Sequence, residues 1–143
     1  MDSNFNLDWA VGLLEEINQS PSKKQWCEQY SVYSDDTSHQ KLNRDIRQLV
    51  DLTYEMFTIS NYSEFLRRQN ISEKVISESN ELWLKEQPYE CVLACITWHF
   101  RRDHFCEGSL ISKSIATGAL LRLFIRLKEL SDTSSENASS NVN

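Results

Sequence analysis

The stretch PYECVLACITWHFRRDHF, residues 88–105, decides the fold of this chain. Pro88 is typical of the start of a helix, because proline lacks the N–H group that the first turn leaves unpaired. In the turns that follow, CVLACITW, apolar side chains face nearly every direction. A helix that is apolar on all sides must be covered on all sides. We therefore expect 88–105 to be the central and most buried helix.

The rest of the chain also favours helices. Apolar residues recur at helical spacing in segments such as 41–59, 71–86 and 119–130, and no sustained alternation typical of a strand occurs. The chain has only three Gly and two Pro, too few for the many tight turns of a sandwich or barrel. We predict an all-α, compact, bundle-like domain of about six or seven helices, with 119–130 packed on the central one.

Several short patterns predict where helices begin. Ser20 followed by Pro21 is typical of a cap and a first helical position. Two Asn-x-x-Glu patterns, Asn61 to Glu64 and Asn70 to Glu73, resemble capping boxes. The second of these predicts one helix over 71–86, with a buried face of Val75, Ile76, Ser79, Leu82 and Trp83.

Length and composition predict one domain and a tail. The chain has 143 residues, which is the size of a single domain with one core. Residues 1–130 carry the helical patterns, whereas 131–143, SDTSSENASSNVN, are almost entirely small and polar. Such a composition buries too little apolar surface to offset the entropy of ordering. We expect a single all-α domain over 1–130 and a disordered tail over 131–143.

The sequence gives three indications of compartment. No stretch approaches the roughly 20 apolar residues that span a bilayer, so no membrane partner is expected. The first residues lack the basic and apolar regions of a signal peptide. Four cysteines, Cys27, Cys91, Cys95 and Cys106, follow no disulfide spacing. Together these features indicate a cytoplasmic protein with free thiols.

Chemistry-bearing residues are densest just after the central helix, in WHFRRDHFCEG at 98–108. Two interpretations fit this cluster. In the structural one, Gly108 takes the left-handed conformation that ends a helix, and Arg101 pairs with Glu107 or a neighbouring carbonyl to hold the corner. In the functional one, Arg101, Asp103, His104 and Glu107 line a cleft that binds an anion or moves a proton.

The same cluster resembles a known sequence signature. Arg101-x-Asp103-His104-Phe105-Cys106-Glu107-Gly108, followed by Gly118 and a helix rich in Leu and Arg that ends Arg126-Leu127, is similar to the C-terminal signature of a bacterial family of small proteins of unknown function. That signature reads roughly Arg-x-Glu-Arg-Phe-x-Asp/Glu-Gly after a Trp. Here Asp and His replace its Glu and second Arg, which weakens any role needing a permanent cation at 104. The resemblance covers 96–130 and implies a shared fold unit.

No catalytic or metal motif emerges. The sequence has no nucleophile elbow, no Gly-rich phosphate loop and no His-Glu-x-x-His pair. Cys91, Cys95, His99 and Asp103 share one helix face, but a single straight helix cannot place ligands tetrahedrally around a metal. We expect small core residues there, with His99 bonded to a backbone group, and we expect no metal and no cofactor.

Charge is spread unevenly and is the clearest indication of a partner. Residues 1–98 carry nine basic and sixteen acidic side chains, whereas 99–130 carry six basic and three acidic ones, within a net charge of −6. The halves could neutralise each other, within one chain or in a homo-oligomer. Alternatively, Arg122 and Arg126 form an exposed basic stripe that meets an acidic partner. The acidic net charge, and the apolar character of 119–130, argue against nucleic-acid binding.

These observations favour a binding protein over an enzyme. We expect a cytoplasmic bacterial or phage-borne accessory protein that binds a protein partner, in the manner of an inhibitor or antitoxin, without catalysis. The alternative is a small enzyme or anion-binding domain that uses Arg101, Asp103, His104 and Glu107.

Overall fold

A computed structural model describes residues 3–34, 38–104 and 106–141, with side chains described over 6–34, 38–104 and 106–132. Within these residues the only regular secondary structure is helical, with no strand, which confirms the all-α prediction. The described residues form nine helices rather than six or seven: α1 Ser3–Gln19, α2 Pro21–Gln29, α3 Gln40–Met56, α4 Tyr62–Arg68, α5 Glu73–Glu78, α6 Glu81–Leu84, α7 Tyr89–Arg101, α8 Ser109–Ala116 and α9 Ala119–Asn141.

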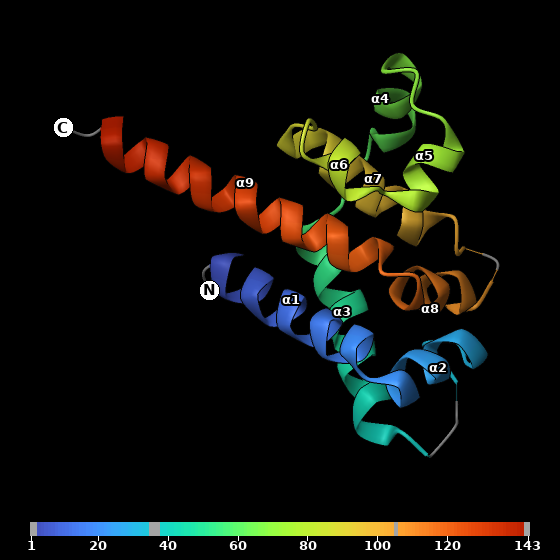
Figure 1. Cartoon of the computed structure of the whole chain (residues 1–143). Helices are drawn as coiled ribbons and strands as arrows, with labels where there is room; N and C mark the ends of the chain where they lie inside the picture. The colour runs from blue at the N-terminus through green and yellow to red at the C-terminus, as the bar shows by residue number, and fades with distance from the viewer. Residues whose placement is uncertain (1–2, 35–37, 105, 142–143) are drawn as a thin grey trace.

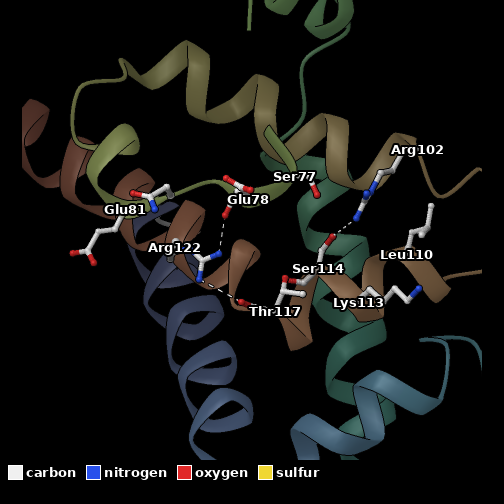
Figure 2. A pocket seen from close by; sticks show the side chains of 10 residues that line it. Ser77, Glu78, Glu81, Arg102, Leu110, Lys113, Ser114, Thr117 and Arg122 are labelled. Atoms are coloured by element: carbon white, nitrogen blue, oxygen red, sulfur yellow. Dashed lines mark hydrogen bonds between the residues drawn. The ribbon is translucent and has the colours of Figure 1, made fainter. Parts of the chain in front are cut away.

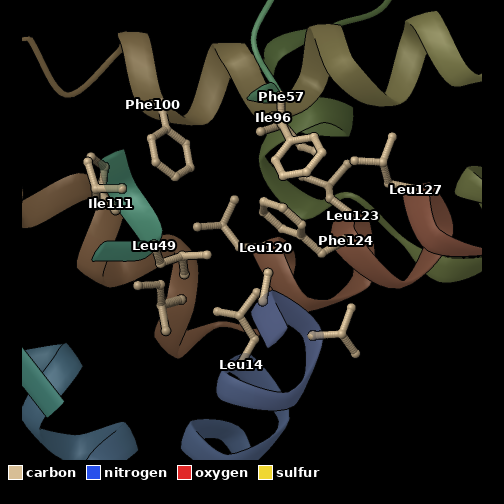
Figure 3. Packing of buried hydrophobic residues seen from close by; sticks show 14 of the residues in the cluster. Leu14, Leu49, Phe57, Ile96, Phe100, Ile111, Leu120, Leu123, Phe124 and Leu127 are labelled. Carbon is tan, nitrogen blue, oxygen red and sulfur yellow. The ribbon is translucent and has the colours of Figure 1, made fainter. Parts of the chain in front are cut away.

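The first and last helices form the long axis of the molecule. Figure 1 shows α1 and α9 side by side and antiparallel, with α3 crossing behind them. On the other side of α9 lies α7, which also contacts α4, α5 and α8. The core fills the space among α1, α3, α7 and α9, and Figure 3 shows its aromatic centre, where Phe57 and Phe124 meet edge to face at 5.7 Å between ring centroids.

Helix α7 is the expected buried helix. Most of its side chains are buried, among them Cys91, Cys95, His99 and Phe100. The helix ends at Arg101, four residues before the end expected from the sequence, and Phe105 lies outside the described residues. The prediction of a largely buried central helix is confirmed, and its C-terminal boundary is corrected.

The predicted helix over 71–86 is two helices, which partly explains the larger count. Ser79 is left-handed, with φ 43°, and ends α5. Asn80 then caps α6, because its side chain accepts a hydrogen bond from the Leu82 N–H at 2.9 Å. The break rotates the following residues, so Leu82, expected in the core, is 74% exposed.

The predicted helix start at Ser20 is confirmed, whereas the one at Asn70 is corrected. Ser20 caps α2, as predicted, by accepting from the Lys23 N–H. Asn70 does not cap the next helix: with φ 56° it closes α4, and the Ile71 N–H bonds back to the Leu66 carbonyl at 3.1 Å. This is the Schellman arrangement, in which asparagine replaces the usual glycine. The cap of α5 is Ser72 instead.

Helix α9 continues past the boundary expected at Leu130 and ends at Asn141. Figure 1 shows its last turns extending beyond the start of α1. The side chains of 133–141 lie outside the described residues, so the division of the chain at residue 130 stays a prediction.

The burial of a side chain predicts how much its replacement by alanine destabilises the protein. Phe124 is fully buried, so Phe124→Ala removes a large core side chain and should lower the free energy of unfolding by about 3–5 kcal/mol. Leu82→Ala, at an exposed position, should change it by less than about 0.5 kcal/mol. Urea denaturation measures both. Equal losses would contradict the break between α5 and α6.

Candidate functional site

The corner after α7 does not assemble the four residues of the functional interpretation. Arg101, His104 and Glu107 are exposed, whereas Asp103 is buried and faces α8. Asp103 Oδ1 accepts the N–H groups of Leu110 at 2.7 Å and Ile111 at 3.1 Å, and its Oδ2 accepts the N–H of Gly108. A carboxylate at this place satisfies N–H groups that the first turn of a helix leaves unpaired and complements the helix dipole.

The predicted clamp between Arg101 and Glu107 is wrong, since the described residues contain no ion pair between them. Asp103 holds the corner through backbone N–H groups. The predicted left-handed conformation of Gly108 is confirmed, with φ 88°, but Gly108 precedes α8 as its N-cap and does not end α7. A Cβ at this position would lie 2.5 Å from Val32 Cγ2. The corner therefore needs glycine for both its conformation and its close packing.

The predicted exposed stripe of Arg122 and Arg126 is also corrected, because both guanidinium groups bind backbone carbonyls. Arg122 donates to the carbonyls of Ser79 at 3.0 Å, Glu78 at 2.7 Å and Thr117 at 3.3 Å. Arg126 donates to those of Lys85 at 3.1 Å and Gln87 at 3.2 Å. Both side chains are half-buried and fasten the α5–α6 segment to α9.

A groove of about 770 Å³ lies between the α5–α6 segment on one side and α8 with the start of α9 on the other. Figure 2 shows its two walls, with the cationic side chains on the wall formed by α7, α8 and α9. The lining residues are Ser77, Glu78, Asn80, Glu81, Arg102, Leu110, Lys113, Ser114, Thr117 and Arg122. We call this feature the α5–α8 groove. Only Arg122 among its residues was a predicted site residue.

Arg102 is a half-buried cation that lines the α5–α8 groove. Its guanidinium lies over the Trp98 ring, 4.6 Å from the centroid, and donates to Ser114 Oγ at 2.9 Å. Burial lowers the pKa of Arg102 from its usual value, but an arginine remains cationic at neutral pH. Its Nε is buried and has no hydrogen-bond partner among the described residues. Among the described residues, no carboxylate forms an ion pair with this cation.

Behind Arg102 the hydrogen bonds continue into the core. His99 Nδ1 lies 2.8 Å from Ser114 Oγ, and its Nε2 lies 2.9 Å from the Ile76 carbonyl. A carbonyl can only accept, so Nε2 carries the proton and Nδ1 accepts from the Ser114 hydroxyl. This confirms that His99 bonds to a backbone group. The chain from Arg102 through Ser114 and His99 to Ile76 joins α7, α8 and α5.

The pair of Ser114 and His99 has the spacing of a nucleophile and its base, but its chemistry does not suit catalysis. Burial lowers the pKa of His99 to about 4, whereas an effective general base has a pKa near the working pH. Ser114 is itself buried and already accepts a hydrogen bond from Arg102. The pair therefore acts as a structural link.

The surroundings of Cys27 and Cys95 favour the protonated thiol, which is the unreactive form. All four cysteines are free, and burial raises the pKa of Cys27 to about 12. The hydrogen bond that the Cys95 thiol donates to Cys91, together with burial, raises the pKa of Cys95, and the same bond lowers the pKa of Cys91. Within the described part of the chain no group of three or more His, Cys, Asp or Glu side chains could hold a metal ion. In the same residues, no helix combines the length and apolar character needed to span a bilayer.

The buried imidazole makes stability depend on pH. Because the pKa of His99 is lowered to about 4 in the folded protein, the unfolded chain binds a proton first as pH falls below 6.5. Stability is therefore lost between pH 6.5 and pH 4. From pH 7 to pH 5 this group should lower the free energy of unfolding by about 2 kcal/mol. Urea denaturation at the two pH values measures the loss.

The matched control is His99→Gln, which removes the titrating group but keeps a side chain able to donate and accept. The part of the pH dependence that belongs to His99 should be absent in this variant. If wild type and variant lose the same stability from pH 7 to pH 5, the imidazole is not buried in its neutral form.

Comparison with protein families identifies the family of this chain. A model for a family of unknown function (DUF6508) matches residues 4–133. No curated protein and no solved structure matches the chain. The matched residues include all of α1 except its first residue, the whole of α2 to α8, and the part of α9 that carries Arg122 and Arg126. The resemblance seen in 96–130 thus extends over nearly the whole sequence, and the chain belongs to this family of unknown function.

Proposed function

We propose that this chain is a binding protein that receives an acidic segment of a protein partner in the α5–α8 groove. The observation that carries the proposal is the set of cations on one wall. Arg102, Lys113 and Arg122 line the groove, and none of them forms an ion pair with a carboxylate among the described residues. A cationic wall of this kind complements a row of carboxylates.

The two walls of the groove carry opposite charges. Glu78 and Glu81 lie on the α5–α6 side, so carboxylates are repelled there and attracted toward α8. Lys113 is exposed, which leaves its ammonium group accessible to a ligand. Arg122 already binds three carbonyls, so it contributes its positive charge more than its hydrogen bonds.

The chemistry of the groove supports binding over catalysis. The Ser114 hydroxyl lies beside His99, and His99 is too weak a base at neutral pH to activate it. The four residues of the alternative enzyme or anion site are split between an exposed surface and the cap of α8. More specifically, we propose that the chain is a cytoplasmic bacterial or phage-borne accessory protein that acts as an inhibitor or antitoxin.

Binding of a fluorescein-labelled hexaglutamate peptide, followed by fluorescence anisotropy at low salt, tests the proposal. Wild type should bind the peptide, and Lys113→Glu should weaken binding about tenfold by removing one attraction and adding one repulsion. Glu78→Gln should strengthen binding, because it removes a carboxylate from the facing wall. Added salt should weaken all three complexes.

Lys74→Glu is the matched control, since Lys74 is exposed on α5 and does not line the groove. It makes the same change in net charge and should bind the peptide nearly as well as wild type. A wild type that does not bind, or equal weakening by Lys74→Glu and Lys113→Glu, would contradict the proposal. Displacement of the peptide by millimolar inorganic phosphate would indicate a small anion as the ligand instead.

A further inference from the structure

A second groove, of about 630 Å³, lies between α1 and α3 and shares no residue with the α5–α8 groove. We call it the α1–α3 groove. Figure 1 shows α3 crossing behind α1, and the groove lies between the first turns of α1 and the last turns of α3. Asn6 and Met56 meet at one end, where the Asn6 amide donates to the Met56 sulfur at 3.1 Å.

Three large apolar side chains form the floor of this groove. Trp9, Leu52 and Met56 pack against the core, but each is only partly buried and lines the groove. Trp and Met are both enriched at protein interfaces, where Trp often supplies much of the binding energy and Met adapts to irregular partner shapes. An apolar floor of this composition fits apolar side chains of a partner.

The rim is acidic and uncompensated. Asp51 and Glu55 are exposed, lie four residues apart on α3 and therefore project from the same face. Neither forms an ion pair with another described residue, and the described residues that line the groove include no Lys, Arg or His. Like charges at this spacing repel each other, so the arrangement does not benefit the isolated helix.

We propose that the α1–α3 groove is the docking site for a basic amphipathic helix of a partner protein. Apolar residues on one face of that helix would contact Trp9, Leu52 and Met56. Lys and Arg residues flanking that face would pair with Asp51 and Glu55. The charge of the rim determines the choice of occupant, because it attracts a cationic helix and repels an acidic segment or an anionic membrane surface. This inference is independent of the proposed function of the α5–α8 groove.

Titration calorimetry with a synthetic amphipathic peptide of leucine and lysine tests this site. Wild type should bind the peptide and should not bind a copy in which glutamate replaces every lysine. The double variant Asp51→Lys with Glu55→Lys should bind at least about tenfold more weakly. Both positions are exposed, so the variant should fold, and its melting temperature checks this.

The matched control reverses two exposed acids elsewhere, Glu28→Lys with Glu86→Lys, and should bind like wild type. Lys113→Glu, in the other groove, should also bind like wild type. Tryptophan emission locates the peptide: its blue shift on binding should be lost in Trp9→Phe and kept in Trp83→Phe.

Three results would overturn the proposal. The first is equal weakening by the rim variant and its control, which would indicate an attraction to net charge alone. The second is equal binding of the glutamate peptide or no binding of the lysine peptide. The third is a wild-type dimer in analytical ultracentrifugation that Leu52→Glu dissociates, which would assign the groove to a second copy of this chain.

Discussion

The α5–α8 groove depends on hydrogen bonds to the carbonyl groups at the C-terminal end of α5. A helix as short as α5, Glu73–Glu78, is not stable alone, and its last turn leaves carbonyls unpaired. Side chains from two other helices satisfy them. His99 of α7 bonds to the Ile76 carbonyl, and Arg122 of α9 bonds to those of Glu78 and Ser79. These bonds fix one wall of the groove to the central helix and to the long axis.

The buried polar side chains of this protein have a structural role, whereas exposed charged side chains remain accessible to a partner. His99, Ser114 and Asp103 are buried and bonded to backbone groups or to each other, so they hold α5, α7 and α8 together. Lys113 has no such role. On a second face of the molecule, Asp51 and Glu55 also form no ion pair with another described residue. The molecule therefore presents a groove with a cationic wall and, separately, a groove with an acidic rim.

Much of the fold follows from local sequence patterns. The absence of strand periodicity predicts an all-helical chain, Ser20 with Pro21 predicts the start of α2, and the apolar run after Pro88 predicts the buried α7. Boundaries are less predictable where two signals compete. The apolar spacing of 71–86 favours one helix, whereas Asn80 before Glu81 is a start signal that the structure uses. Asn70 serves α4 as a C-terminal residue, although its sequence context equally resembles an N-cap.

The candidate site is harder to predict because its contacts join distant parts of the chain. Arg122 and the carbonyl of Ser79 are 43 residues apart, and nothing in the local pattern around Arg122 distinguishes a buried donor from an exposed cation. Asp103 illustrates the same difficulty at short range, since its three partners are backbone N–H groups, which carry no sequence signal. The polar stretch 98–108 contributes Arg102 to the lining of the groove, whereas the predicted Arg101 does not line it.

Hydrogen exchange of Arg122→Gln tests most directly whether side chains from other helices hold the α5–α6 segment in place. The shorter amide cannot reach all three carbonyls, so backbone amides of 73–84 should exchange at least about tenfold faster than in wild type. Amides of α1 should be unchanged, as should all amides in Lys128→Gln, which loses only a surface pair with Asp8. Unchanged exchange over 73–84, or equal acceleration throughout the protein, would contradict this central role of Arg122.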